Sequence, residues 1–319
     1  MSNISYSYTN ITAGLQYQSV LERVILSCLS TLPACVLLFI NGTMMFTLRS
    51  KPVFRDTCRY VLLYNLLVAD TAQLAMSQVL FLLASCRVQL TYPVCGTFTT
   101  LANLTASISP LTLVVMSLER YVAVCYPLRH ASIITIRNTT LAVIATWAVS
   151  SLNNVTRCFF LLQFSVEKLG TFLMKDYCYD INWFPDPLRE NFDKTYTCFM
   201  SISAGLAVIF SYTGVVLAAK SASTDKVSAL KAQKTLLLHL VQLGLSLSST
   251  IYYPLLVVFA KTVTRIIFVW VQDIFYVLFI ILPRCLTSLI YGLRDQTIRP
   301  VLLYYLYGRL KLSVEPGPG

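Results

Sequence analysis

Seven long stretches of almost entirely apolar residues alternate with shorter polar segments along the chain. They cover residues 24–48, 60–86, 98–118, 138–156, 195–219, 235–260 and 266–292. A helix needs about 20 predominantly apolar residues to cross a bilayer, and inside lipid its backbone must form its hydrogen bonds internally. The pattern therefore predicts an all-α membrane protein built as a seven-transmembrane helix bundle.

The polar segments at both ends of the chain divide it into three regions. We expect an extracellular tail at 1–23, the transmembrane domain at 24–292 and a cytoplasmic segment at 293–319. Within the last segment Asp295 is placed to cap a short helix whose apolar positions recur at helical spacing. These positions are Ile298, Val301, Leu302, Tyr305 and Leu306. They predict an amphipathic eighth helix on the membrane surface.

Composition and charge support a membrane protein and give its orientation. The chain is 56% hydrophobic and 12% charged, whereas soluble proteins carry roughly 25% charged residues. Of the 25 lysines and arginines, 15 fall in one alternating set of connections and 9 in the other, with Arg284 inside an apolar run. Cytoplasmic connections are the more basic ones, so we expect the N-terminus outside and the C-terminus in the cytoplasm. The net charge of +11 then reflects membrane topology, and no nucleic-acid partner is expected.

One string of residues is far more specific than the pattern around it. Residues 116–130 read Met-Ser-Leu-Glu-Arg-Tyr-Val-Ala-Val-Cys-Tyr-Pro-Leu-Arg-His. Because charges are costly in hydrocarbon, Glu119 and Arg120 indicate where the third helix meets water, and Pro127 should end that helix. Taken alone, this is an ion pair at a helix end. The whole string resembles the third-helix end and second intracellular loop of rhodopsin-like G-protein-coupled receptors, in particular the fish-type odorant receptors. Leu-Ile-Tyr-Gly-Leu-Arg-Asp at 289–295 adds to the resemblance.

The resemblance implies a cytoplasmic switch. Glu119, Arg120 and Tyr121 match the motif that engages a heterotrimeric G protein, with Arg120 exposed on activation. Lys234 falls where many receptors carry an acid that holds this arginine, so Glu119 is the remaining partner for Arg120. In the seventh helix, only Tyr291 survives from the family's Asn-Pro-x-x-Tyr motif.

The family's spacing also implies a ligand pocket in the outer half of the bundle. Its lining is mostly apolar with a few hydroxyl and amide groups, which suits a small-molecule odorant. Ala102 stands where amine receptors carry an acid. For each residue, ordinary helix packing is the alternative. The expected residues are Ala102, Asn103, Ala106, Tyr252, Leu255, Leu256, Phe259, Tyr276 and Val277.

Four polar residues inside the apolar runs form an expected intramembrane network. Asp70 and Asn41 match family positions in the second and first helices, and Ser109 matches a third-helix serine that helps hold sodium beside the acid. Arg284 lies about two helical turns before Tyr291, and we expect its guanidinium to replace the ion and pair with Asp70. The alternatives are a hydrogen-bonded packing role for Asp70 and contact of Arg284 with headgroups or water.

Cysteines and sequons mark the outer side. The resemblance implies a disulfide between Cys95 and Cys178. Cys158 and Cys198 could form a second bridge or remain free thiols. Asn3 and Asn10 begin two sequons in the N-terminal tail, and we expect both to be glycosylated.

These features together predict a plasma-membrane odorant receptor that binds small molecules and activates a heterotrimeric G protein. A rhodopsin-like receptor for a lipid or peptide is the nearer alternative. A multi-pass transporter is the more distant one, because transporters usually show matched halves and broken helices, and this sequence shows no matched halves. No nucleophile–base pair or metal-ligand cluster indicates an enzyme, and no cofactor or metal is expected.

Overall fold

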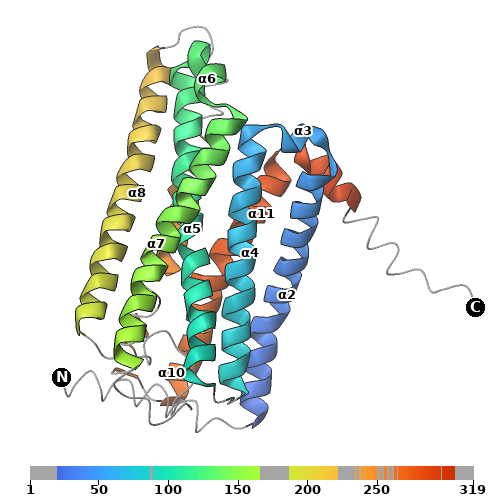
Figure 1. The fold of residues 1–319 in the computed structure, drawn as a ribbon. Helices are drawn as coiled ribbons and strands as arrows, with labels where there is room; N and C mark the ends of the chain where they lie inside the picture. The colour runs from blue at the N-terminus through green and yellow to red at the C-terminus, as the bar shows by residue number, and fades with distance from the viewer. Residues whose placement is uncertain are drawn as a thin grey trace, which may run out of the picture.

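The computed structural model describes residues 20–86, 88, 90–165, 187–221, 234, 237–238, 240–249, 252, 255–256, 259, 262–263, 265–295 and 297–305. These parts of the chain are almost entirely helical, and the long helices run side by side as a bundle (Figure 1). The helices are α2 (Val20–Ser50), α3 (Pro52–Arg55), α4 (Cys58–Ser85), α5 (Tyr92–Cys125), α6 (Pro127–Ile133), α7 (Ile136–Ser165), α8 (Pro187–Ser221), α10 (Arg265–Phe275), the π-helix η1 (Tyr276–Ile281) and α11 (Leu282–Arg294).

The described helices match the predicted membrane-spanning runs. Five are long and apolar enough to cross a bilayer, and α6 with residues 136–159 counts as a sixth span if the 67° bend between them is allowed. Of the predicted sixth run, the longest described piece is the apolar helix Leu240–Ser249. The expected all-α membrane bundle is therefore confirmed.

The third helix is longer than its apolar run. α5 continues to Cys125, so Glu119 and Arg120 lie inside the helix, which ends two residues before Pro127, in agreement with the prediction that Pro127 ends it. Pro127, which lacks an N–H, begins the separate short helix α6.

α5 occupies the middle of the bundle, in contact with α4, α7 and α8. At the contact with α8, Gly214 lies so close to the Tyr121 ring that an added Cβ would stand 2.9 Å from Cδ2. Tyr121 therefore packs against the backbone of α8, with the Phe210 ring 5.5 Å away.

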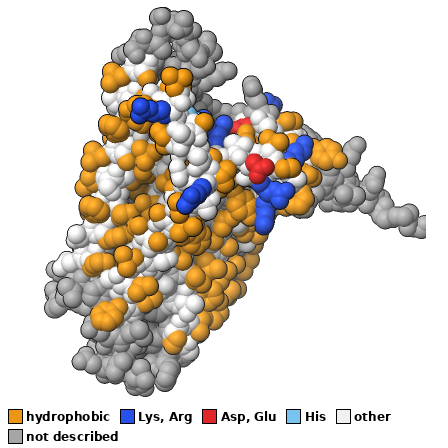
Figure 2. Space-filling model, turned by 45° about the horizontal axis from the view of Figure 1, so that its top comes forward, with side chains coloured by type: hydrophobic (Ala, Val, Ile, Leu, Met, Phe, Trp, Pro, Cys, Tyr) orange, Lys and Arg blue, Asp and Glu red, His pale blue; other side chains and the backbone are white. Residues whose placement is uncertain are grey.

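The outside of the bundle is apolar along its length and basic at one end. Exposed hydrophobic side chains such as Leu152, Phe199 and Leu206 face outward, as expected for contact with lipid tails. Figure 2 shows hydrophobic side chains spread over the flank, with lysines and arginines gathered towards the end that carries α3. The exposed basic residues there include Arg55 and Arg129.

The last membrane-spanning helix widens in its middle. Residues 276–281 form the π-helix η1, and the N–H of Leu282 donates to the carbonyl of Val277, five residues earlier. Pro283 follows directly and cannot donate a backbone hydrogen bond. The widened turn therefore stands beside the proline that interrupts the regular pattern.

The predicted eighth helix is present at residues 298–305. Asp295 caps it, accepting hydrogen bonds on Oδ1 from the N–H groups of Thr297 (2.9 Å) and Ile298 (3.3 Å). Ile298 and Leu302 are buried and Tyr304 is exposed, as an amphipathic helix requires.

Candidate functional site

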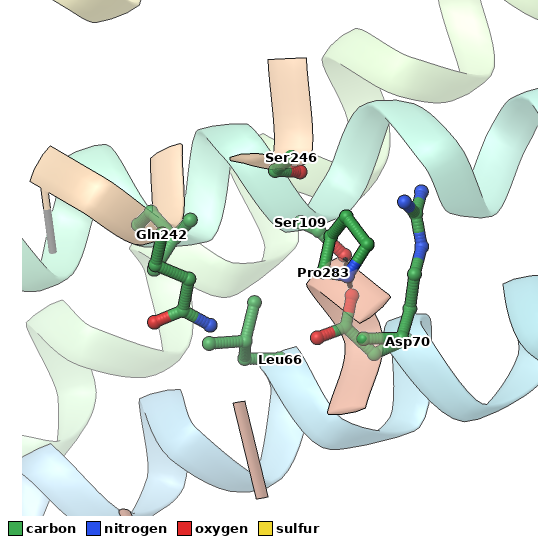
Figure 3. A pocket seen from close by; sticks show the side chains of 8 residues that line it. Leu66, Asp70, Ser109, Gln242, Ser246 and Pro283 are labelled. Atoms are coloured by element: carbon green, nitrogen blue, oxygen red, sulfur yellow. Dashed lines mark hydrogen bonds between the residues drawn. The ribbon is translucent and has the colours of Figure 1, made fainter. Parts of the chain in front are cut away.

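Asp70 lies in the middle of the bundle on the wall of a narrow cavity. The cavity has about 180 Å³ of space between atoms, too narrow for a water-sized sphere, and it is lined from several helices by Leu66, Asp70, Ser109, Leu113, Gln242, Ser246, Pro283 and Arg284. Ser109 donates a 2.6 Å hydrogen bond to Oδ1 of Asp70 (Figure 3). The structure thus brings together three of the four expected network residues.

Arg284 is the largest fully buried side chain in the described part of the protein, with 1% of its surface exposed. Its Nε and Nη1 atoms have no hydrogen-bond partner. No ion pair within 4.0 Å joins it to Asp70, although the charge of Asp70 acts on the guanidinium through space. The expected closeness of the two residues is therefore present, but the expected direct pair is not.

Asn41, the fourth expected member, is held in the neighbouring layer. Its side-chain nitrogen donates to Thr71 Oγ1 at 3.2 Å, and its oxygen accepts a hydrogen bond from Ser288. These contacts join α2, α4 and α11 beside the Asp70 cavity.

A second polar contact was missed from the sequence. Asn65 donates to Thr112 Oγ1 at 2.9 Å and accepts from the Trp147 indole at 2.8 Å, which links α4, α5 and α7. The signal was available, because Asn65 lies five residues before Asp70 inside an apolar run, but its partners depend on how the helices rotate.

Five of the expected pocket residues gather in two adjoining hydrophobic clusters that share Tyr252. Tyr252, Tyr276 and Val277 belong to one cluster with Ala34 and Leu74. The other cluster joins Leu256, Phe259 and Tyr252 with Phe275, whose ring stands edge-to-face to Phe259 at 5.2 Å. The remaining expected residues, half-buried, are Leu255 and, on α5, Ala102, Asn103 and Ala106.

Tyr276 is fixed by a hydrogen-bond chain across the helices. Its hydroxyl donates to Gln78 Oε1 at 3.1 Å, and Gln78 Nε2 donates to Thr31 Oγ1 at 2.8 Å. The Tyr276 ring also stacks on Phe81 at 4.8 Å. Gln78 was not singled out from the sequence, where it is one of several amides in the second run.

At the basic end of the bundle Arg120 pairs with its neighbour Glu119. The distance from Nε to Oε2 is 3.2 Å, and His130 Nε2 stands 4.0 Å from the other carboxylate oxygen of Glu119. This is the partner that the sequence predicted for Arg120. Lys234 is exposed, and Tyr291 is buried in the adjacent core with Met44 and Leu302.

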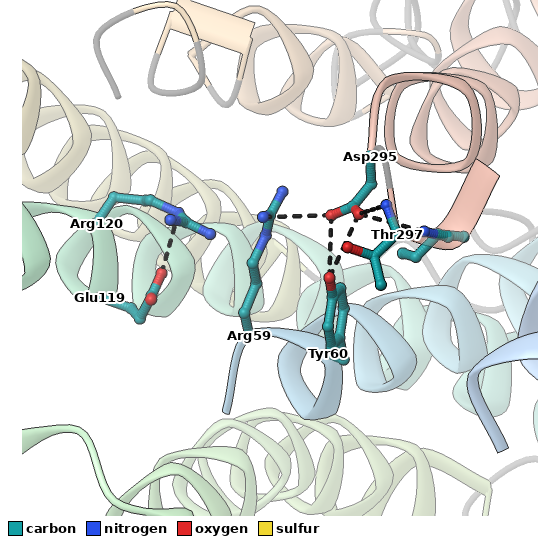
Figure 4. Close-up of polar contacts among 7 residues, drawn as sticks. Arg59, Tyr60, Glu119, Arg120, Asp295 and Thr297 are labelled. Atoms are coloured by element: carbon teal, nitrogen blue, oxygen red, sulfur yellow. Dashed lines mark hydrogen bonds and ion pairs between the residues drawn. The ribbon is translucent and has the colours of Figure 1, made fainter. Parts of the chain in front are cut away.

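A second ion pair next to Arg120 was not predicted. Arg59 Nη1 lies 3.2 Å from Asp295 Oδ2, and the Tyr60 hydroxyl donates to the same carboxylate at 3.3 Å. Figure 4 shows Arg59 lying between Arg120 and Asp295. The start of α4 is thereby tied to the cap of the eighth helix.

Cys95 is disulfide-bonded, as expected, while Cys158 and Cys198 are free thiols. Cys178, Asn3 and Asn10 lie outside the described residues, so the pairing with Cys178 and the two glycans stay predictions. In the described part of the chain no group of three or more His, Cys, Asp or Glu side chains could hold a metal.

The described helices surround a buried acid, and an Arg120–Glu119 pair lies at the basic end of the bundle, an arrangement consistent with a seven-transmembrane receptor. Residues 40–291 match the family described as 7 transmembrane receptor (rhodopsin family), and the chain belongs to this family. It is 31% identical to Odorant receptor 131-2 of Danio rerio over 312 residues, 96% of this chain and 91% of that protein. It is also 26% identical to Olfactory receptor 51I2 of Homo sapiens over 217 residues, 63% of this chain and 64% of that protein. A third relative, Olfactory receptor 4K14 of Homo sapiens, is 22% identical over 82% of this chain and 83% of its own length.

Proposed function

We propose that this protein is an odorant receptor of the plasma membrane, which binds small-molecule odorants among its helices and activates a heterotrimeric G protein. The observation that carries the proposal is the 31% identity with an odorant receptor along 96% of the chain. Two further features support it: the aromatic and aliphatic clusters around Tyr252 and the Arg120–Glu119 pair at the opposite, basic end.

The ligand occupies the end at which α5 and α10 begin, and the G protein docks at the basic end. Basic connections are typical of the cytoplasmic side, which supports an extracellular N-terminus. If so, Asn3→Gln and Asn10→Gln each remove a glycan, and no glycan is attached at Asn138 near the start of α7. A glycan on Asn138 would contradict this orientation.

Arg120 transmits ligand binding to the G protein. Its pair with Glu119 holds the guanidinium along α5, and activation releases it to the partner. In cells that express the receptor, a panel of odorants is screened with cAMP as the readout, and the responding odorant is tested on Arg120→Ala. The expected result is loss of the cAMP response at an unchanged surface level.

The matched control is Arg55→Ala, which removes an exposed arginine at the same end without touching Glu119. It keeps most of the response. An equal loss in both variants would mean that only the general positive charge matters, and an unchanged response in Arg120→Ala would refute the switch.

A further inference from the structure

Asp273 is a carboxylate turned into the bundle near the end where the ligand is proposed to bind. On its helix the residues Ile267, Trp270 and Ile274 are exposed and mark the lipid face, whereas Asp273 is 8% exposed and belongs with Gln272 and Tyr276 to the buried side. Asp273 stands eight residues after the start of α10 at Arg265, which is about 12 Å along the helix axis. It is therefore within the membrane-spanning part and faces inward.

Among the residues that the structure describes, this carboxylate has no counter-ion. Its Oδ2 atom is buried without a hydrogen-bond partner, and the ion pairs of the described residues involve other carboxylates. The hydroxyl of Tyr276, about one helical turn after Asp273, donates its hydrogen bond to Gln78 and not to Asp273. A buried carboxylate with no partner is costly, and intramembrane acids are rare and usually functional.

The surroundings of Asp273 are aromatic and aliphatic. Tyr276 and Val277 follow Asp273 by about one helical turn, and the Tyr276 ring stacks on Phe81. A cation held by the carboxylate would also meet aromatic rings, whose faces attract positive charge. Its apolar body would meet Tyr276 and Val277, which are among the expected pocket residues and share a cluster with Tyr252.

We propose that Asp273 binds the ammonium group of an amine-bearing odorant, with the apolar part of the ligand packed in the clusters around Tyr252. The ammonium N–H donates to Oδ2, so the ligand supplies a counter-ion that the described residues do not provide. This rests on the proposed odorant-receptor function and adds the chemical class of the ligand. Ala102 leaves α5 without an acid for this purpose, and Asp273 provides one from the seventh helix.

The test compares three series of ligands with the same carbon skeletons: alkyl and aryl amines, the corresponding alcohols and the corresponding carboxylic acids. In receptor-expressing cells, amines evoke cAMP at concentrations at least tenfold lower than the alcohols do. Asp273→Asn raises the half-maximal amine concentration on the order of 30-fold or more, because the charge pair is lost. Asp273→Glu keeps most of the amine response. Glu22→Gln, which removes an exposed carboxylate of α2, changes nothing.

Each outcome bears on the inference. Strong responses to alcohols or acids, with amines silent or unaffected by Asp273→Asn, overturn it and leave the odorant-receptor function standing. If no ligand evokes cAMP, the proposed function fails; thermal unfolding of the purified receptor with each amine, which needs no G protein, then decides the inference. Amines that raise the unfolding temperature of the unmodified protein but not of Asp273→Asn support it, and the absence of any such rise refutes it. If Asp273→Asn does not reach the surface, the amine–alcohol comparison in the unmodified receptor and in Asp273→Glu decides.

Discussion

Asp70 and Arg284 carry opposite charges on the wall of one cavity, but their hydrogen bonding differs. Asp70 accepts a hydrogen bond from Ser109, while two nitrogens of Arg284 have no acceptor. The guanidinium places a fixed positive charge beside the carboxylate, and the cavity is too narrow for a water-sized sphere. The guanidinium would therefore repel a sodium ion, and the cavity has no room for the water molecules that usually complete its coordination.

The first prediction follows from this arrangement. In the unmodified receptor, replacing sodium by choline at constant ionic strength leaves the agonist concentration for half-maximal response unchanged. Arg284→Ala removes the positive charge and opens space next to Asp70, so the same measurement then shows a dependence on sodium. A sodium-dependent shift in the unmodified protein would show that Arg284 does not take the place of the ion. The double variant Arg284→Ala with Asp70→Asn, which lacks the carboxylate, is the control and stays insensitive.

For single residues, the sequence predicts which polar side chains lie inside the bundle, but not all of their contacts. The shared position of Asp70, Ser109 and Arg284 could be predicted, because helical spacing and the family resemblance indicate how deep each residue lies and which side of its helix it occupies. The hydrogen bond from Ser288 to Asn41 and that from Trp147 to Asn65 depend on small rotations of α11 and α7. Those rotations result from packing of the whole bundle and have no local signal.

At the scale of helices, α5 and α8 lie in close contact where Gly214 meets Tyr121. Gly214→Ala puts a methyl group into the ring, and relieving such overpacking typically costs about 1–3 kcal/mol. We expect a lower unfolding temperature of the purified receptor. Gly205→Ala on the same helix is the matched control, because nothing lies within 4 Å of its added Cβ. It should leave stability equal or slightly higher, and Tyr121→Ala should relieve the defect of Gly214→Ala.

The cap of the eighth helix is a second element-scale contact. Asp295→Ala removes a cap, which typically costs about 0.5–2 kcal/mol, and also removes the partner of Arg59 and Tyr60. Asp295→Asn keeps the acceptor for the Thr297 and Ile298 N–H groups but loses the charge. Hydrogen exchange of residues 298–305 should rise strongly in Asp295→Ala and little in Asp295→Asn. Equal exchange in both variants would mean that the ion pair, and not the cap, holds this helix.

Helix existence was predictable here, but helix shape was not. The apolar runs give the spans, and Asp295 with the pattern after it gives the eighth helix. Pro127 also gave the end of α5, beyond its apolar run. The π-helical turn before Pro283 depends on how the seventh helix packs against its neighbours and has no local signal.

For the molecule as a whole, the outer disulfide is expected to determine whether the receptor reaches the cell surface. Cys95 is disulfide-bonded, and Cys178 is its proposed partner. Cys95→Ala and Cys178→Ala should each abolish surface expression or ligand response, because a native disulfide typically contributes about 2–5 kcal/mol. Cys198→Ala, which removes an exposed free thiol, is the control and keeps both. Normal surface expression and response in either of the first two variants would argue against the pairing.

The burial of Arg284 also has a consequence for how the protein is made. Translation delivers the seventh helix last, and an arginine within it disfavours insertion by about 2.5–3.5 kcal/mol. The seventh helix is therefore unstable in lipid after it leaves the translocon, until it packs against the polar residues Asp70 of α4 and Ser109 of α5. If this packing is slow, the charged helix stays exposed to the quality-control machinery of the endoplasmic reticulum. We therefore expect slow assembly of the seventh helix with α4 and α5 to lower the yield of receptor at the cell surface.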